Sequence, residues 1–265
     1  MSRAGDVSMQ LAEIARTAGD ALLDVPPETM DRRQKPSGEW VTTADEASHR
    51  LLRRMLAEAF PDTPAVLEEQ DNALPLPDTC LAVDELDGTH VFMNGLGDWG
   101  VSLALIEDGR PLAGVLHQPA TGVLIRAARD EGCWVGDQRL TFGGVTSLSG
   151  RLIGAEVNRY LPWGEFVWIG ALARQCAGVR GLATAVGNAV ELLLGGTVLF
   201  VNARGGKLWD FAAAALAVEE AGGVALSCSG EPLRWSAIEM SALFAANAAV
   251  AEQALSLRAE AGEPG

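Results

Sequence analysis

The chain has 265 residues, of which 48% are hydrophobic, and its formal net charge is −15. This length suits one large domain or two modest halves around a cleft, with enough apolar side chains for a substantial core. The negative charge disfavours nucleic-acid backbones and anionic membranes as partners. A small phosphorylated ligand is still compatible with it, because bound divalent cations reverse the local potential.

The cysteine content and the termini indicate the compartment. The chain holds four cysteines far apart with no C-x-x-C spacing, Cys80, Cys133, Cys176 and Cys228. This disfavours zinc and redox use and favours free thiols in a reducing environment. Residues 1–10 lack the apolar stretch of a signal peptide, and apolar runs such as Phe211–Val218 are too short to span a bilayer. We therefore expect a cytoplasmic protein that does not enter a membrane.

The first third of the chain predicts two helices and two strands. Apolar residues at helical spacing predict a helix over residues 6–24, and residues 28–41 are polar and indicate a loop. A second helix is expected from a cap at Thr42 or Thr43 through Glu58. Short strands are then expected at Ala65–Glu68 and Cys80–Asp84.

The middle of the chain indicates an antiparallel meander. Four strands separated by turn residues are expected at Gly100–Ile106, Pro111–His117, Gly122–Ala128 and Gly132–Val135. A purely doubly wound parallel sheet is therefore disfavoured.

After the small polar segment 146–150 the pattern changes to alternating helices and strands. The expected helices are Gly164–Cys176, Asn188–Leu194, Asp210–Ala221 and Ala248–Ala261, and the expected strands are Val198–Asn202, Val224–Ser227 and Ser241–Ala246. We predict an N-terminal α+β half over residues 1–147 and a C-terminal α/β half over residues 148–265, built as layered sheets covered by helices.

The segment from Ala82 to His90 is the most informative one. Asp84 and Asp87 lie three residues apart after an apolar run, and Gly88-Thr89 follows them. We expect a strand to deliver Asp84, a tight turn to present Asp87, and a helix to start at Gly88-Thr89. Paired carboxylates hold hard cations such as Mg²⁺, and free backbone N–H groups attract phosphate. Alone the pattern is weak, because Asp-Gly is also an ordinary solvated turn.

Two further acidic elements strengthen this interpretation. Glu68-Glu69 ends one predicted strand, and Asp210 follows Trp209 at the start of an Ala-rich helix. If these ends converge, their oxygens can hold two or three hard cations for displacement at phosphorus. Simpler interpretations exist: Asp210 as a helix N-cap, and Glu68-Glu69 as surface charge, with Glu68 favoured as the ligand and Glu69 outside.

Taken together, the Glu-Glu pair, the D-x-x-D-G-T motif and the Trp-Asp pair resemble the inositol monophosphatase superfamily of Mg²⁺-dependent, lithium-sensitive phosphatases. Matching segments run along residues 8–260 and include Val41–Asp45, Trp99–Ile106 and Glu219–Gly223. The resemblance implies a five-layer αβαβα sandwich with mixed and antiparallel sheets. It also implies a homodimer.

The resemblance also implies roles for single residues. Mg²⁺ would be ligated by Glu68, Asp84, Asp87, Asp210 and the backbone carbonyl of Leu86. Thr89 and Asp45 would orient the attacking water, which the metal and Glu68 activate. The alternative for Asp45 is that it only opens a helix beside the helix dipole. The N–H groups of Gly88 and Thr89 would hold phosphate oxygens.

Several positions depart from the family pattern. Glu85 replaces the usual Pro, and Ala213-Ala214 replaces an Ala-Gly pair that permits close helix packing. Ala203 lies in the segment where inositol-specific members carry a Glu, which makes inositol phosphate a less secure substrate. His90 beside the phosphate could bind substrate or donate a proton, or have no role.

The remaining candidates lie in the second half and among the other histidines. Gly187, Asn188 and Ala189 match a small-residue segment near the substrate, where Asn188 could hydrogen-bond a hydroxyl. His49 and His117 are expected to be structural or on the surface, and Lys35 could steer phosphate or lie in a solvated loop.

The predicted function is a Mg²⁺-dependent phosphomonoesterase that uses metal-activated water on a small polyol, sugar, amino-alcohol or nucleoside phosphate. One alternative is a histidinol-phosphate or 3′-phosphoadenosine-5′-phosphate phosphatase. Another is a non-catalytic relative that binds metal or ligand.

Overall fold

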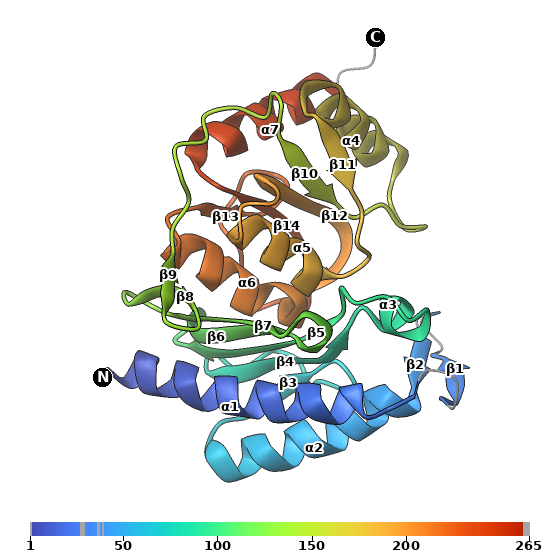
Figure 1. The fold of residues 1–265 in the computed structure, drawn as a ribbon, viewed down its shortest axis with the longest axis vertical. Helices are drawn as coiled ribbons and strands as arrows, with labels where there is room; N and C mark the ends of the chain where they lie inside the picture. The colour runs from blue at the N-terminus through green and yellow to red at the C-terminus, as the bar shows by residue number, and fades with distance from the viewer. Residues whose placement is uncertain (1, 27–29, 36–37, 39, 262–265) are drawn as a thin grey trace.

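The computed structural model describes residues 2–26, 30–35, 38 and 40–261 and arranges them in five layers (Figure 1). From one end to the other these are a helix pair, a seven-stranded sheet, a second helix pair, a five-stranded sheet and a third helix pair. The pairs are α1 (Arg3–Leu23) with α2 (Thr43–Ala59), α5 (Ala185–Leu193) with α6 (Leu208–Glu220), and α4 (Trp163–Gln175) with α7 (Ala248–Ala261). The predicted αβαβα sandwich is confirmed.

The seven-stranded sheet contains the predicted meander. Its order is β3-β4-β5-β6-β7-β8-β9, in which β3 and β4 are parallel and every later neighbour is antiparallel. The strands are β3 (Ala65–Leu67), β4 (Cys80–Asp87), β5 (Gly100–Glu107), β6 (Arg110–Gln118), β7 (Val123–Ala128), β8 (Gly132–Val135) and β9 (Gln138–Leu140). A short 3₁₀ helix, η2 (Pro119–Thr121), joins β6 to β7. The sequence did not predict β9, which is only three residues long.

The five-stranded sheet is mixed, with the order β11-β10-β12-β14-β13. Its strands are β10 (Leu152–Ala155), β11 (Gly178–Arg180), β12 (Leu199–Lys207), β13 (Val224–Leu226) and β14 (Glu239–Ala245). Neither β10 nor β11 was predicted, because neither of these short segments, Leu-Ile-Gly-Ala and Gly-Val-Arg, alternates apolar and polar residues.

A small hairpin corrects another prediction. Residues 28–41 were expected to form a loop, yet β1 (Arg32–Gln34) pairs antiparallel with β2 (Trp40–Thr42). Residues 28, 29, 36, 37 and 39 of that segment lie outside the described residues. The hairpin leads directly into α2, whose N-cap Thr42 accepts hydrogen bonds from the backbone of Ala44 and Asp45.

Three apolar clusters hold the layers together. One lies between α1, α2 and the seven-stranded sheet, a second between the opposite face of that sheet and α5 and α6, and a third beneath α4 and α7. Helix α6 is buried on all sides along the alanine run from Ala212 to Ala215. These small side chains let α6 lie directly on β6, where a Cβ added to Gly114 would lie 2.8 Å from the Cα of Ala213. The glycine that permits this approach is therefore on the strand, not in the helix.

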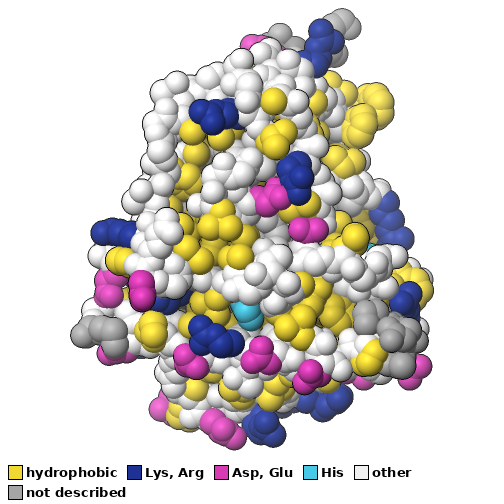
Figure 2. All heavy atoms as spheres, in the orientation of Figure 1, with side chains coloured by type: hydrophobic (Ala, Val, Ile, Leu, Met, Phe, Trp, Pro, Cys, Tyr) yellow, Lys and Arg dark blue, Asp and Glu magenta, His cyan; other side chains and the backbone are white. Residues whose placement is uncertain are grey.

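The surface charges agree with the negative net charge, and the cysteines are free as their spacing predicts. On the face shown in Figure 2, Asp and Glu side chains gather over α1 and α2, with Lys and Arg scattered among them. All four cysteines are free thiols, and three of them are buried. Among the helices in the described ranges, none has the length and apolar content required to cross a bilayer.

Gly114→Ala should lower the free energy of unfolding by about 1–3 kcal/mol, because the new methyl group would meet the backbone of α6. Urea denaturation followed by circular dichroism measures this change. Gly170→Ala in α4 is the matched control, since a Cβ there meets nothing within 4 Å. Equal stability of the Gly114 variant and the wild type would contradict the close packing of β6 and α6.

Candidate metal and phosphate site

Three carboxylates from two elements converge at one point. Asp84 and Asp87 come from the end of β4, and Asp210 comes from the first turn of α6. One oxygen of each lies within 4.8 Å of the others. The backbone N–H of Lys207 donates to Asp210 Oδ2 at 2.8 Å, so Asp210 is the third residue of the helix and accepts from its cap residue. Three oxygen ligands at this separation suit a hard cation.

A bulge in β4, not a tight turn, presents Asp87. The strand continues through Asp87, and its ladder with β5 pairs Asp84 with Ser102 and Asp87 with Gly100. Three residue steps on β4 therefore face two on β5, which leaves one extra residue on β4. A bulge of this kind turns both aspartates to the same side of the sheet, where alternation alone would place them on opposite faces.

The second half of the chain holds Asp87 in place. Its carboxylate accepts from the hydroxyl of Thr184, from the backbone N–H of Ala185 at 3.1 Å and from that of Val186 at 2.6 Å. Thr184 is the N-cap of α5, so this helix begins at Ala185 and not at Asn188 as predicted. The signal available in the sequence was a threonine before small residues, which is a common N-cap pattern.

These aspartates are not a solvated turn. Asp84 is 2% exposed and Asp87 is 8% exposed, and both face a cavity of about 540 Å³. Eighteen residues line it: Gly38, Trp40, Glu68, Asp84, Leu86, Asp87, Gly88, Thr89, His90, Glu156, Asn158, Arg159, Tyr160, Ala183, Gly205, Lys207, Trp209 and Asp210.

Glu68 and Glu69 share one lysine. Lys35 Nζ lies 3.4 Å from Glu68 Oε1 and 2.5 Å from Glu69 Oε1. The side chains of the two glutamates are 26% and 12% exposed, so neither is a free surface charge. Only Glu68 lines the cavity. Lys35 is itself largely buried, which corrects the alternative of a solvated loop lysine.

Burial and mutual repulsion disfavour ionisation of the cluster. Burial raises the pKa of Asp210 to about 8, with a further contribution from the charge of Asp87. Burial also raises the pKa of Asp84 and of Glu68 well above the usual carboxyl range, and each of these is raised further by neighbouring carboxylates. A bound divalent cation offsets such repulsion. The all-oxygen donor set and the uncompensated charge therefore fit a hard divalent metal.

A hydroxyl–carboxylate pair lies beside the aspartates. Thr89 Oγ1 donates to Asp45 Oδ1 at 2.9 Å, and Thr42 donates to Asp45 Oδ2 through its backbone N–H at 2.7 Å. Thr89 begins the short helix α3 (Thr89–Met93), and the preceding Gly88 has a φ of +87°, which glycine adopts without strain. Asp45 thus completes the capping box of α2 and also holds Thr89, which lines the cavity, while Asp45 itself is buried behind it and is not among the lining residues.

The predicted substrate residues fall in two places. His90 is exposed, lines the cavity and lies edge-on to Trp40 with 6.5 Å between ring centroids. Gly187, Asn188 and Ala189 are buried and are not among the lining residues. The amide of Asn188 instead donates to Glu156 Oε1 at 2.6 Å, and Glu156 faces the cavity.

Sequence reasoning missed the wall of the cavity that the second half supplies. Glu156, Asn158, Arg159 and Tyr160 follow β10, an element that was not predicted. Ala183 lines the cavity in a left-handed conformation with a φ of +55°. No periodicity or motif marks these positions, because they reach the site through loops.

Glu85 and the partly buried His49 form a hydrogen-bonded pair. Glu85 is 0% exposed, and its Oε1 lies 2.6 Å from Nδ1 of His49, a contact that fits the expected structural role of His49. The hydrogen bond to Glu85 raises the pKa of His49. Glu85 is therefore a packed residue of β4 whose carboxylate is hydrogen-bonded to His49.

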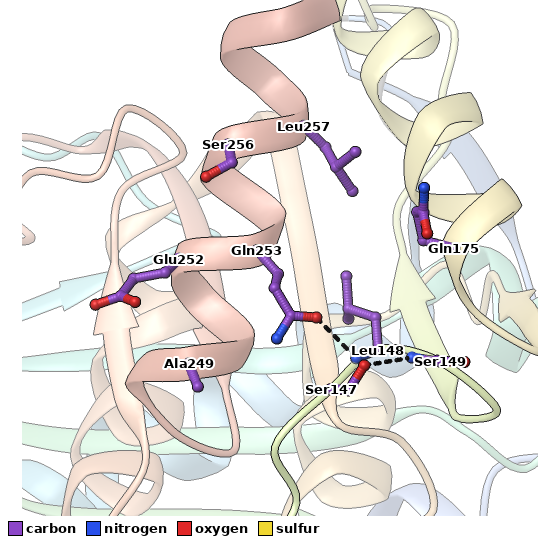
Figure 3. Close-up of a pocket in the computed structure, with 9 residues that line it drawn as sticks. All are labelled: Ser147, Leu148, Ser149, Gln175, Ala249, Glu252, Gln253, Ser256 and Leu257. Atoms are coloured by element: carbon purple, nitrogen blue, oxygen red, sulfur yellow. Dashed lines mark hydrogen bonds between the residues drawn. The ribbon is translucent and has the colours of Figure 1, made fainter.

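A second cavity lacks this chemistry. It lies between α7, the end of α4 and the segment before β10 (Figure 3). Of the nine residues that line it, only Glu252 carries a charge, and Gln253 accepts a hydrogen bond from the backbone of Leu148 at 3.2 Å. The carboxylate cavity is the better candidate for a reaction.

The layered fold and the acidic site define a metal-assisted phosphatase of the αβαβα class. The model of the inositol monophosphatase family matches residues 6–263, and the chain belongs to this family. The predicted membership in a family of phosphoric monoester hydrolases is confirmed.

The relatives carry different names. The Nus factor SuhB of Pasteurella multocida is 30% identical over 202 residues, which cover 74% of each chain. The 3′(2′),5′-bisphosphate nucleotidase CysQ of Escherichia coli is 29% identical over 86% of this chain and 93% of its own. The solved structure of the IMPase of Thermotoga maritima has a TM-score of 0.84 and 25% identity, covering 94% of this chain and 95% of that one.

The stability of metal-free protein should fall as the pH rises from about 4 to about 8. The pKa of Asp210 is raised from 3.8 to about 8, so in this window the folded state holds a proton that the unfolded chain has released. Added Mg²⁺ should therefore raise the melting temperature more at pH 8 than at pH 5.5. Thermal denaturation in EDTA and in Mg²⁺ at both pH values measures this.

Asp210→Asn is the comparison variant, because its amide oxygen can still accept from the Lys207 N–H while the charge is gone. This variant should show a smaller loss of stability with pH and a smaller gain from Mg²⁺. An identical response of variant and wild type would remove Asp210 from the cation site.

Proposed function

We propose that this protein is a Mg²⁺-dependent phosphomonoesterase that hydrolyses a small polyol, sugar, amino-alcohol or nucleoside phosphate. The observation that carries the proposal is the convergence of Asp84, Asp87 and Asp210 in one cavity that Thr89, hydrogen-bonded to Asp45, also lines. Glu68 and Leu86 line the same cavity, and the Glu68 carboxylate and the Leu86 carbonyl would complete the oxygen donor set.

The cation would supply Lewis acidity, lowering the pKa of water and neutralising charge on the phosphoryl oxygens. The side chains of the protein would orient the attacking water. Because the Thr89 hydroxyl donates its hydrogen bond to Asp45, the lone pairs of Thr89 Oγ1 are free to accept a hydrogen bond from an attacking water, which orients that water; the water still has a proton to lose. Glu68, whose pKa burial raises, is suited to take up that proton.

The phosphate group would lie against the start of α3. Gly88 and Thr89 line the cavity, and their backbone N–H groups are the proposed contacts to phosphate oxygens. His90 would contact the alcohol part of the substrate from the exposed side of the same helix. Contacts by Gly187, Asn188 and Ala189 would then be indirect, through Glu156 and Thr184. A cytoplasmic homodimer completes the proposal.

Two names among the relatives favour alternatives. The name bisphosphate nucleotidase of the E. coli relative favours a nucleoside bisphosphate as substrate. The name Nus factor of the P. multocida relative favours a binding role without turnover. Release of inorganic phosphate from p-nitrophenyl phosphate in Mg²⁺ separates the second alternative from a phosphatase, because a binding module would bind the ion and release none.

Asp84→Asn should abolish this Mg²⁺-dependent release and leave the fold intact. Asp84 Oδ1 accepts one local hydrogen bond, from the N–H of Leu86, which an amide oxygen can also accept. Asp87→Asn is a poorer test, because its amide would face three donors from Thr184, Ala185 and Val186. Asp62→Asn, on the exposed surface, is the control. Wild-type release by the Asp84 variant would refute the proposed site.

Thr89→Ala should lower kcat by about 100-fold and change KM much less, because the hydroxyl orients water in the transition state. Steady-state kinetics in saturating Mg²⁺ measure the two constants separately. Thr89→Ser keeps the hydroxyl and should retain most of kcat. A Thr89→Ala variant with unchanged kcat would show that the hydroxyl has no part in the reaction.

A further inference from the structure

Arg159 extends over the cavity from the segment after β10. It lines the cavity, and its Nη2 donates to the carbonyl of Gly38 at 2.8 Å. Gly38 precedes β2, so the guanidinium connects the substrate wall of the second half to the hairpin of the first half. Arg159 is exposed, and this hydrogen bond holds its guanidinium group at the mouth of the cavity.

A second contact sets the plane of the guanidinium group. Its Nη2 also donates to the hydroxyl of Tyr160 at 2.6 Å, and its central carbon lies 4.8 Å from the centroid of the Tyr160 ring. The Nε and Nη1 groups make no hydrogen bond to any residue that the structure describes. Arg159 thus offers donors from a side chain that two other contacts already orient, which lowers the entropy lost on binding an anion.

Arg159 has no acidic partner among the residues that the structure describes. Five carboxyl groups line the cavity, from Glu68, Asp84, Asp87, Glu156 and Asp210. Of the two basic residues that line it, Lys207 pairs with Glu239, whereas Arg159 has no carboxylate within 4.0 Å among the described residues. An arginine held in a cavity without an acidic partner is suited to bidentate binding of a carboxylate or a phosphate.

We propose that Arg159 selects phosphate esters whose alcohol part carries a second anionic group. This rests on the proposed function, with the reacting phosphate at Gly88 and Thr89 and the second anion at Arg159 near the mouth of the cavity. Neutral polyol phosphates are then poorer substrates, and cationic amino-alcohol phosphates are poorer still, because their ammonium group would face a guanidinium group. Arg159 is a specificity residue in this scheme and takes no part in the chemical step.

A matched pair of esters tests the proposal. Glycerol 2-phosphate and 2-phosphoglycerate differ only in that a CH₂OH group of the first is a carboxylate in the second. The wild type should prefer 2-phosphoglycerate in kcat/KM by about tenfold or more, the effect expected of one charge-assisted hydrogen-bonded pair. 3′-AMP and adenosine 3′,5′-bisphosphate form a second pair, in which the added anion is a phosphate, and they show which anion is preferred.

Arg159→Gln should reduce each preference ratio toward one, and Arg159→Lys should keep part of it because the charge remains. The ratio is the informative quantity, because a purely structural effect would lower both members of a pair alike. Arg204→Gln is the matched control: Arg204 is exposed and close in the fold, since its carbonyl accepts from Asn158, but it does not line the cavity. This control should show wild-type rates and ratios.

Two results would overturn the proposal: a wild-type ratio at or below one for both pairs, or an unchanged ratio in Arg159→Gln. If neither member of a pair is hydrolysed in Mg²⁺, the proposed function fails separately. The same ratios measured as dissociation constants by titration calorimetry in Mg²⁺ then decide the role of Arg159, because binding of the second anion does not require turnover.

Discussion

The crowding of buried carboxylates at one end of the seven-stranded sheet is the constraint on which the rest of the site depends. Burial and neighbouring charge raise the pKa of Asp84, Asp210 and Glu68, so the cluster opposes its own ionisation. Surrounding groups have to hold it in position. The bulge in β4, the N–H of Lys207 and the N-terminus of α5 each fix one aspartate. Because the fold holds mutually repelling carboxylates in fixed positions, a cation bound between them would offset the repulsion.

The close packing of α6 follows from the same constraint. Asp210 can reach the aspartates of β4 only if α6 lies directly on the sheet, and the alanine run facing Gly114 makes that approach possible. Ser102 of β5 also donates to the carbonyl of Trp209 at 2.9 Å, which fixes the first turn of α6 beside the strand that pairs with β4. The small side chains and this buried hydrogen bond therefore bring Asp210 close to the aspartates of β4.

The motif predicted from the sequence is the part of the site whose residues are close in the chain. Asp84, Asp87, Gly88 and Thr89 lie within one segment, so a motif could place them beside one another, whereas the ligand roles of Glu68 and Asp210 came from the family resemblance, and both residues line the same cavity. Glu85 and His49 show the limit of such reasoning. The sequence shows a glutamate in place of the usual proline, but its partner His49 lies 36 positions earlier on helix α2, and only the fold brings the two together. The meander was predictable because alternation and turns repeat along it, whereas the short strands β10 and β11 lack such alternation.

The same distinction separates the acidic half of the cavity from the opposite wall. The acidic half depends on regular elements, β4 and α6, whose register leaves little freedom for substitution. The opposite wall depends on the connections after β10, before α5 and within β12, where Arg159, Ala183 and Gly205 reach the cavity. Connecting segments tolerate change without loss of the core. A fold of this kind can therefore keep one acidic centre while the opposite wall varies, and in this chain that wall presents the guanidinium group of Arg159.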